Sequence, residues 1–272
     1  MFGKKYLNLM LLTLGLVLQV EAQELLEKHL RPDFQQILDS AGVNGVLLLA
    51  DFQGSRLYSN DFGLAEQGQL PASTFKIPHS LIALELGIVE DETTVFPWNG
   101  EERAMSQWEQ DLTFRQAFHL SCVPCYQAIA RQVGLKRMMN YLAHLDYGRM
   151  DVSEQNLDQF WLRGDSRISP LEQIDFLRRL HAGELDLAPE TMETFREMIV
   201  IEESEGYRLS GKTGWSVDQG VDNGWFVGYL EKAGKVYFFA SNLAPLPGTT
   251  DTDFLQARKG VTVEVLRVLG FL

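Results

Sequence analysis

Apolar and polar positions divide the chain into strand-rich ends and a helix-rich middle. Apolar residues recur at helical spacing from Gln23 to Ser40, so we predict one or two short helices there, interrupted at Pro32. Val43–Asp51 is rich in Val and Leu, and Arg56–Ser59 follows after a short polar stretch, a pattern typical of a β-hairpin. The N-terminal part of the chain is therefore expected to supply two adjacent strands.

The middle and the end of the chain differ in pattern. From Thr74 to about Phe195 the apolar spacing is mainly helical, with Gly and Pro residues as punctuation. Aromatic and β-branched residues then predict three strands at 207–215, 224–230 and 235–242, followed by a helix from Asp253 to Leu269. Because strands at both ends flank the helices, we predict an α+β fold. An antiparallel sheet is built from N- and C-terminal segments, with flanking helices, an inserted helical lobe and a cleft between the lobes.

The length and net charge of the chain exclude some kinds of partner. The 272 residues, 45% of them hydrophobic, are sufficient for a sizeable core, and no internal repeat or linker-like change in composition is visible. The formal net charge of −13 argues against nucleic acid or an anionic membrane as a partner, because both would repel the chain. The five histidines show no metal-site spacing, so no metal is expected. Nothing in the sequence indicates an oligomeric state.

Residues 1–22 have the pattern of an export signal. Lys4 and Lys5 precede an apolar run from Leu7 to Val20, and Val20-Glu21-Ala22 places small residues where a signal peptidase reads. The apolar run is short for a membrane span, although an uncleaved anchor is the alternative. We therefore predict a signal peptide at 1–22, a catalytic domain at 23–272, a periplasmic location and no membrane attachment after cleavage.

The two cysteines lie close together as Cys122-Val123-Pro124-Cys125. After a strand, this spacing would suggest a thioredoxin-like redox pair. The preceding segment, Thr113–Leu120, instead has a helical pattern. A local structural disulfide or two buried thiols is the favoured interpretation, and an oxidoreductase remains the alternative.

A nucleophile and a base are suggested by Ser73 and Lys76, which lie where a loop enters an apolar helix. Residues three apart on a helix share a face, so the two side chains are expected to be within reach of each other. A serine hydroxyl needs a neighbouring base, and a lysine serves as one when burial lowers its pKa. Taken alone, the pattern also fits a serine that caps a helix.

Five short motifs follow one another along the chain: Ser73-Thr74-Phe75-Lys76, Ser121-Cys122-Val123, Tyr147-Gly148, Phe160-Trp161-Leu162 and Lys212-Thr213-Gly214. In this order and spacing they resemble the class D serine β-lactamases, the oxacillinases. The first and last motifs occur throughout the penicillin-recognising serine enzymes. The resemblance covers nearly all of 23–272 and implies a secreted hydrolase that opens the β-lactam ring of penicillin-type antibiotics and so gives resistance.

The resemblance implies roles for the residues around Ser73. Ser73 would be the nucleophile that holds the acyl group, and Lys76 would be the general base for acylation and deacylation. In this family the lysine is carbamylated by carbon dioxide, so a carbamate on Lys76 is the expected modification, with no other cofactor. The Trp161 indole N–H would hold a carbamate oxygen. The apolar carbamate pocket would be formed by Phe75, Val123, Trp161 and Leu162.

The resemblance also implies how the β-lactam substrate is bound. Ser121 would pass a proton to the departing nitrogen, and Lys212 with Arg258 would attract the substrate carboxylate. The backbone N–H groups of Ser73 and Trp215 would form an oxyanion hole. The substrate-binding residues would be Lys212, Thr213, Gly214, Trp215 and Arg258. Without the resemblance, Arg258 is expected to be an exposed charge on the last helix.

The chain departs from the family pattern, and other functions share parts of it. Arg149 follows Tyr147-Gly148 where the family has Asn, and Trp215 follows the last motif where many relatives have Phe. A β-lactam sensor domain that stays acylated and a peptidoglycan D,D-peptidase share several motifs. A sensor domain is expected to be attached to a multi-helix membrane region. A D,D-peptidase generally lacks the Tyr-Gly and Trp-Leu elements.

Overall fold

The computed structural model describes residues 27–51 and 55–272, so the predicted signal peptide and the tip of the first hairpin lie outside the described residues. The strands are β1 (Glu27–Leu30), β2 (Val43–Ala50), β3 (Arg56–Ser59), β4 (Val95–Phe96), β5 (Leu112–Thr113), β6 (Val200–Glu203), β7 (Tyr207–Asp218), β8 (Val221–Lys232) and β9 (Lys235–Pro245). The helices are α1 (Pro32–Ser40), α2 (Phe62–Ala65), α3 (Lys76–Glu85), α4 (Phe114–His119), α5 (Val123–Val133), α6 (Leu135–Leu145), α7 (Pro170–Ala182), α8 (Pro189–Met198) and α9 (Asp251–Val268), with 3₁₀ turns η1 (Ala72–Phe75) and η2 (Ser106–Trp108).

One seven-stranded sheet joins the two ends of the chain, in the order β1-β3-β2-β9-β8-β7-β6. β2 lies antiparallel to β9, with Val43 opposite Pro245 and Ala50 opposite Phe238. The predicted sheet of N- and C-terminal segments is therefore confirmed, as are the first hairpin and the three C-terminal strands.

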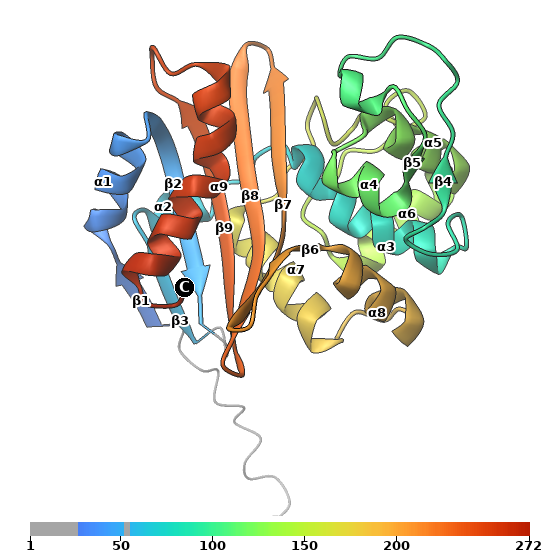
Figure 1. Cartoon of the computed structure of the whole chain (residues 1–272). Coiled ribbons are helices and arrows are strands. Elements are labelled where there is room, and N and C mark those ends of the chain that lie inside the picture. Colours follow the sequence, from blue (N-terminus) through green and yellow to red (C-terminus); the bar gives the residue numbers. More distant parts are fainter. Residues whose placement is uncertain (1–26, 52–54) are drawn as a thin grey trace, which may run out of the picture.

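The sheet separates two apolar cores. Alternate residues of its central strands point to opposite faces, so Leu47 and Leu49 of β2 enter one core while Val46 and Leu48 enter the other. Helices α1 and α9 cover the first face, and α7 covers the second (Figure 1). Helices α3, α4, α5, α6 and α8 form a lobe beside β7, as predicted, while the short α2 packs against β2. Among the described residues, none of the helices combines the length and the apolar character needed to cross a membrane.

Three parts of the predicted secondary structure were wrong. Glu27–Leu30 forms a strand parallel to β3 and not the start of a helix, because pairing satisfies its backbone groups while its side chains stay mostly exposed. The helical run from Thr74 is interrupted over 86–113 and 146–169, where Gly residues and a left-handed Asp146 end the helices. The short strands β4, β5 and β6 were missed, since two to four residues give no recognisable alternation.

Candidate active site

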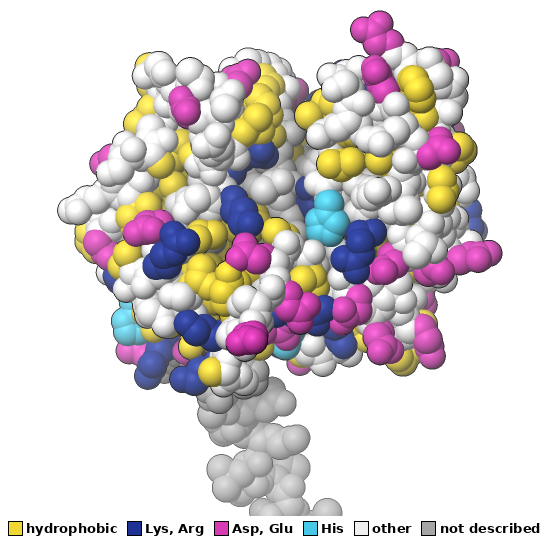
Figure 2. Space-filling view, viewed as in Figure 1, with side chains coloured by type: hydrophobic (Ala, Val, Ile, Leu, Met, Phe, Trp, Pro, Cys, Tyr) yellow, Lys and Arg dark blue, Asp and Glu magenta, His cyan; other side chains and the backbone are white. Residues whose placement is uncertain are grey.

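Ser73 lies at the junction between the sheet and the helical lobe. It belongs to η1, which packs against β7 and β8 and leads directly into α3. Gly214 of β7 allows this close approach, because a Cβ on it would lie 3.3 Å from the Ser73 backbone nitrogen. Figure 2 shows a hollow between the two parts of the molecule, with Lys and Arg surface inside it.

The loop before Ser73 is fixed by two side chains that sequence reasoning missed. Asn223 Nδ2 and Trp225 Nε1, both on β8, donate hydrogen bonds to the Leu70 carbonyl oxygen, each at 2.7 Å. These donors belong to a strand 150 residues further along the chain, so local sequence gave no signal of them. They hold the entry to η1 against the sheet.

Ser73 and Lys76 form the predicted pair. Lys76 Nζ donates a hydrogen bond to Ser73 Oγ at 3.1 Å, and Lys76 is fully buried. Burial lowers the pKa of Lys76 to about 7, so a large share of the side chain is neutral at neutral pH. Ser73 makes no cap hydrogen bond to the helix, so the capping alternative does not apply.

The four predicted pocket residues all belong to or pack against one apolar core. The rings of Phe75 and Trp161 are stacked with centroids 5.6 Å apart, and both side chains are fully buried. Val123 and Leu162 are partly buried and pack against the same core. The Tyr126 ring, which sequence reasoning missed, lies 4.9 Å from Lys76 Nζ.

Trp161 Nε1 is a buried donor without a hydrogen-bond partner in the described structure. A buried N–H normally has an acceptor, since leaving it unpaired costs free energy. A carbamate on Lys76 would supply an acceptor oxygen inside this pocket. The residues present therefore fit the expected modification.

Ser121 connects the helical lobe with the sheet. It lies between α4 and α5 with a left-handed φ of 55°. Lys212 Nζ on β7 donates hydrogen bonds to Ser121 Oγ at 2.5 Å and to the Thr213 carbonyl oxygen at 2.9 Å. Burial, together with the positive charges of Lys76 and Arg258, holds the pKa of Lys212 well below its usual value.

Arg258 reaches the site from α9, on the opposite face of the sheet. Its Nη1 donates to the Gly214 carbonyl oxygen at 2.6 Å, and only 8% of its surface is exposed. Gly224 makes room for it, because a Cβ there would lie 2.9 Å from Arg258 Cδ. Burial lowers the pKa of Arg258 to about 10. The exposed-charge alternative for Arg258 was therefore wrong.

These side chains form a cluster of buried cations. Lys76, Lys212 and Arg258 have no ion-pair partner within the described residues, and none of the Asp or Glu side chains described there is buried. A molecule of formal charge −13 thus keeps an electropositive interior next to Ser73. Thr213, Gly214 and Trp215 extend along β7 beside this cluster, so Ser73, Lys76, Ser121 and the predicted substrate-binding residues lie in one region.

Comparison with known proteins identifies the family. A model described as "Penicillin binding protein transpeptidase domain" matches residues 49–257. The chain is 39% identical to beta-lactamase OXA-10 of Pseudomonas aeruginosa, over 85% of this chain and 86% of that protein. It is 41% identical to beta-lactamase OXA-48 of Klebsiella pneumoniae, over 82% of both chains. The crystal structure of the class D beta-lactamase YbXI from Nostoc has a TM-score of 0.83 and 38% identity, covering 88% of this chain and 99% of that chain.

The chain belongs to the class D β-lactamases. The family, the fold class and the enzyme class predicted from the motifs are thereby confirmed. In the residues that the structure describes, no group of three or more His, Cys, Asp or Glu side chains is arranged to hold a metal ion.

The Tyr-Gly motif of this class D β-lactamase contacts Thr74, the residue that follows Ser73. Tyr147 Oη donates to Gln173 Oε1 at 3.2 Å and lies 3.3 Å from Thr74 Oγ1. Gln173 Nε2 donates to the same Thr74 oxygen at 2.9 Å. Arg149 lies on the surface, where Nη2 donates to the Asp165 carbonyl oxygen at 3.3 Å. The departure from the family's Asn thus places a cation on the surface and not among the buried cations.

Cys122 and Cys125 of this β-lactamase form a disulfide. Both residues are buried, and the pair lies at the start of α5, after helix α4 and not after a strand. The disulfide is therefore favoured over two buried thiols, and its structural role stays a prediction. The bond links the residue next to Ser121 to the residue before Tyr126.

Replacing both cysteines with alanine is expected to lower the free energy of unfolding by about 2 kcal/mol, the loop-closure entropy of so short a loop. Urea unfolding of Cys122→Ala/Cys125→Ala against the parent measures this difference. The same comparison under strong reducing conditions is the control, because the difference should shrink as the parent loses its bond. An unchanged unfolding midpoint after both mutation and reduction would exclude a stabilising role.

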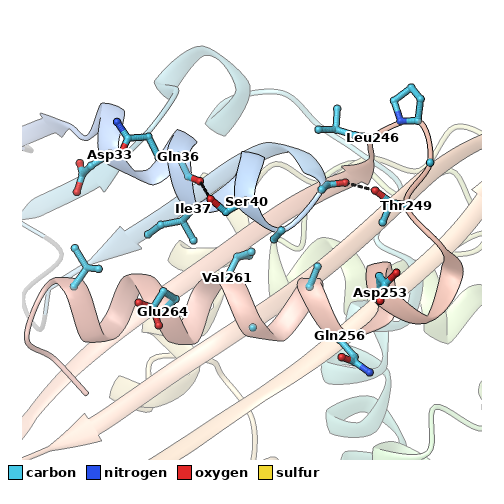
Figure 3. Close-up of a pocket in the computed structure, with 17 residues that line it drawn as sticks. Asp33, Gln36, Ile37, Ser40, Leu246, Thr249, Asp253, Gln256, Val261 and Glu264 are labelled. Atoms are coloured by element: carbon cyan, nitrogen blue, oxygen red, sulfur yellow. Dashed lines mark hydrogen bonds between the residues drawn. The ribbon is translucent and has the colours of Figure 1, made fainter.

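A second large concavity lies away from the cation cluster. It has a volume of about 1190 Å³ and lies between α1, α9 and the loop 246–249 (Figure 3). Its walls carry Asp33, Asp253 and Glu264 and contain none of the candidate site residues. This concavity is therefore separate from the candidate site around Ser73.

Proposed function

We propose that this chain is a secreted hydrolase that opens the β-lactam ring of penicillin-type antibiotics through an acyl-enzyme on Ser73, and so gives antibiotic resistance. One observation carries the proposal: Ser73 Oγ is hydrogen-bonded to a fully buried Lys76 whose pKa is lowered to about 7. Family membership supports β-lactam hydrolysis as the reaction. A serine beside a neutral buried base is the arrangement that acyl transfer requires.

In the first half-reaction, Ser73 Oγ attacks the lactam carbonyl carbon and gives its proton to the base at Lys76. The carbonyl oxygen becomes negative and accepts hydrogen bonds from the backbone N–H groups of Ser73 and Trp215. The ring C–N bond then breaks. Ser121, hydrogen-bonded to Lys212 at 2.5 Å, gives its proton to the departing nitrogen and takes in return the proton that the base received from Ser73, so the base is free again for the second half-reaction.

In the second half-reaction, a water molecule attacks the ester carbon and releases Ser73. Lys76 faces Ser73 Oγ, so the same position serves to accept the proton of that water. When a carbamate is bound to Lys76, it supplies an anionic general base for both acylation and deacylation. The lowered pKa of Lys76 provides the neutral amine that carbon dioxide requires, and the Trp161 indole N–H provides a donor for a carbamate oxygen.

The cation cluster suits an anionic substrate. Lys212 and Arg258 would attract the carboxylate of the β-lactam, and the β7 segment 213–215 would lie alongside it. A buried cation without a carboxylate partner is destabilised until an anion arrives. The net attraction would therefore be stronger than that of an exposed ion pair.

Time-resolved intact-protein mass with a penicillin, with and without bicarbonate, tests the proposal when it is combined with the loss of β-lactam absorbance. A transient adduct on Ser73 with many turnovers, faster with bicarbonate, is the expected result. A permanent one-to-one adduct without turnover would indicate a sensor or a transpeptidase-like protein. Absence of any adduct would contradict an acyl-enzyme. It would favour the alternative function, an oxidoreductase that uses the cysteine pair.

We also propose that residues 1–22 direct the chain to the periplasm and are removed there. The support is the basic start, the apolar run and the small exit residues in the sequence. The mass of the protein recovered from the periplasm should correspond to a chain that begins at Gln23. Recovery of the full-length chain in the membrane fraction would favour the uncleaved anchor.

Trp161→Phe is expected to weaken the binding of carbon dioxide at Lys76 about tenfold, because it removes the indole N–H while keeping the aromatic ring. Turnover in air should fall and recover partly as bicarbonate is added. Trp98→Phe is the matched control, since the Trp98 indole donates to the Glu101 carbonyl oxygen in a different loop. If bicarbonate has no effect on either the variant or the parent at low pH, Lys76 is not carbamylated.

A further inference from the structure

His79 is a buried imidazole with no hydrogen-bond partner. It lies on α3, is fully buried, and neither Nδ1 nor Nε2 has a partner among the described residues. A neutral imidazole carries one donor and one acceptor, so both functions are left unpaired. The described structure contains eight such buried unpaired atoms, and three of them belong to His79 and Trp161. The cluster therefore needs an explanation beyond ordinary core packing.

The three unpaired atoms surround the pocket of Lys76. His79 follows Lys76 by one helical turn, which places both side chains on the same face of α3. The His79 ring centroid lies 5.4 Å from that of Phe75, 5.3 Å from that of Tyr126 and 5.3 Å from that of Trp161. The Tyr126 ring also lies 4.9 Å from Lys76 Nζ, so His79 and Lys76 share this ring as a neighbour.

No neighbouring side chain in the described part of the chain is available as a hydrogen-bond acceptor for the N–H of His79. The Tyr126 hydroxyl is already hydrogen-bonded to Ser80 Oγ at 2.6 Å. Phe75 offers no acceptor, and the Trp161 indole is itself a donor. None of the Asp and Glu side chains in the described ranges is buried. The N–H of the His79 ring and the N–H of Trp161 therefore both lack an acceptor within the described structure.

Burial keeps the His79 ring neutral, and the charge on Lys76 adds to this effect. Burial, and secondly the positive charge of Lys76, lower the pKa of His79 to about 3, so the ring is neutral at working pH. A neutral ring still offers one N–H donor. If Lys76 became anionic, the repulsion would turn into attraction and that donor would gain an acceptor.

We propose that His79 is a positioning residue for the carbamate on Lys76, donating a ring N–H into the pocket alongside the indole N–H of Trp161. The inference deepens the proposed function and rests on its carbamate. The alternative is a purely structural role, in which His79 is a core histidine whose hydrogen-bond partner is an enclosed water molecule. The two differ in one property: only a carbamate-positioning residue changes the affinity of Lys76 for carbon dioxide.

The test measures carbamate formation directly, by the carbamate signal in ¹³C NMR of the purified protein titrated with ¹³C-labelled bicarbonate. His79→Leu keeps an apolar filling of similar size without a donor, and the apparent dissociation constant for carbon dioxide should rise about tenfold. His79→Asn retains an amide donor, and its dissociation constant should stay within about threefold of the parent. The rescue by Asn separates donation from packing, because Asn fills the pocket less well than Leu.

A second readout covers the case in which His79→Leu does not fold. Bicarbonate should raise the melting temperature of the parent and of His79→Asn by mass action, and should raise that of His79→Met much less. Equal carbon dioxide affinity in the parent and in the apolar variant would overturn the role of His79, while the parent's carbamate signal would uphold the proposed base. Absence of a carbamate signal in the parent would overturn both.

Discussion

Ser73→Ala is expected to reduce the turnover of a penicillin by at least about a thousandfold, the loss typical of removing a nucleophile. Without Oγ no acyl-enzyme forms, so the intact-mass adduct should also disappear. The fold should be retained, since Ser73 Oγ makes one hydrogen bond, to Lys76, and no helix cap. Steady-state absorbance kinetics and intact mass measure the two effects on the same sample.

Ser241→Ala is the matched control for this substitution. Ser241 is also a buried serine, but it lies on β9 and donates to the Phe226 carbonyl oxygen at 3.2 Å. Its turnover should stay close to that of the parent. Turnover by Ser73→Ala above about a thousandth of the parent would mean that another group attacks the lactam.

Motif spacing predicted the contact between Ser73 and Lys76, because this contact is local and is fixed by a regular element. Ser73 and Lys76 are three residues apart at the start of a helix, so their contact follows from helical geometry. The three C-terminal strands were also predictable, since their aromatic and β-branched residues fill both faces of a buried sheet. Close spacing also brought Cys122 and Cys125 within bonding distance, but it did not distinguish a disulfide from two thiols.

Long-range contacts could not be predicted in this way. Leu70 is held by donors from β8, and Arg258 crosses the sheet only because Gly224 lacks a side chain. β1 forms a strand because β3 offers a free edge, which no pattern within Glu27–Leu30 reveals. Sequence patterns assigned His79 no role beyond the absence of a metal-site spacing, and its two unpaired nitrogens become visible only when its neighbours are placed.

The buried cations imply that this active site is maintained at a cost in stability. Lys76 is fully buried and has no ion-pair partner in the described residues, so folding removes its charge from water without compensation. An apolar side chain of similar length would avoid that cost. Function and stability are thus expected to oppose each other at this residue.

Lys76→Met is expected to abolish turnover, with a loss of about a thousandfold that bicarbonate does not restore, because the variant has neither a base nor an amine for carbon dioxide. In buffer free of carbon dioxide at pH 7, the same variant should be more stable than the parent by about 2–4 kcal/mol, because it removes an uncompensated buried charge. Urea unfolding measures the stability.

The pH dependence of stability gives an independent check on Lys76. Its pKa is about 7 in the folded protein and near 10.5 when unfolded, so between these values the unfolded chain binds a proton that the folded chain does not. The parent's free energy of unfolding should therefore rise with pH, and the Lys76 penalty, complete below pH 7, should vanish near pH 10.5. Lys76→Met should show a shallower rise, while Lys136→Met, at an exposed lysine of α6, should follow the parent. Parallel curves for the parent and Lys76→Met would mean that Lys76 remains fully charged in the folded protein, and the neutral-amine route to its carbamate would fail with it.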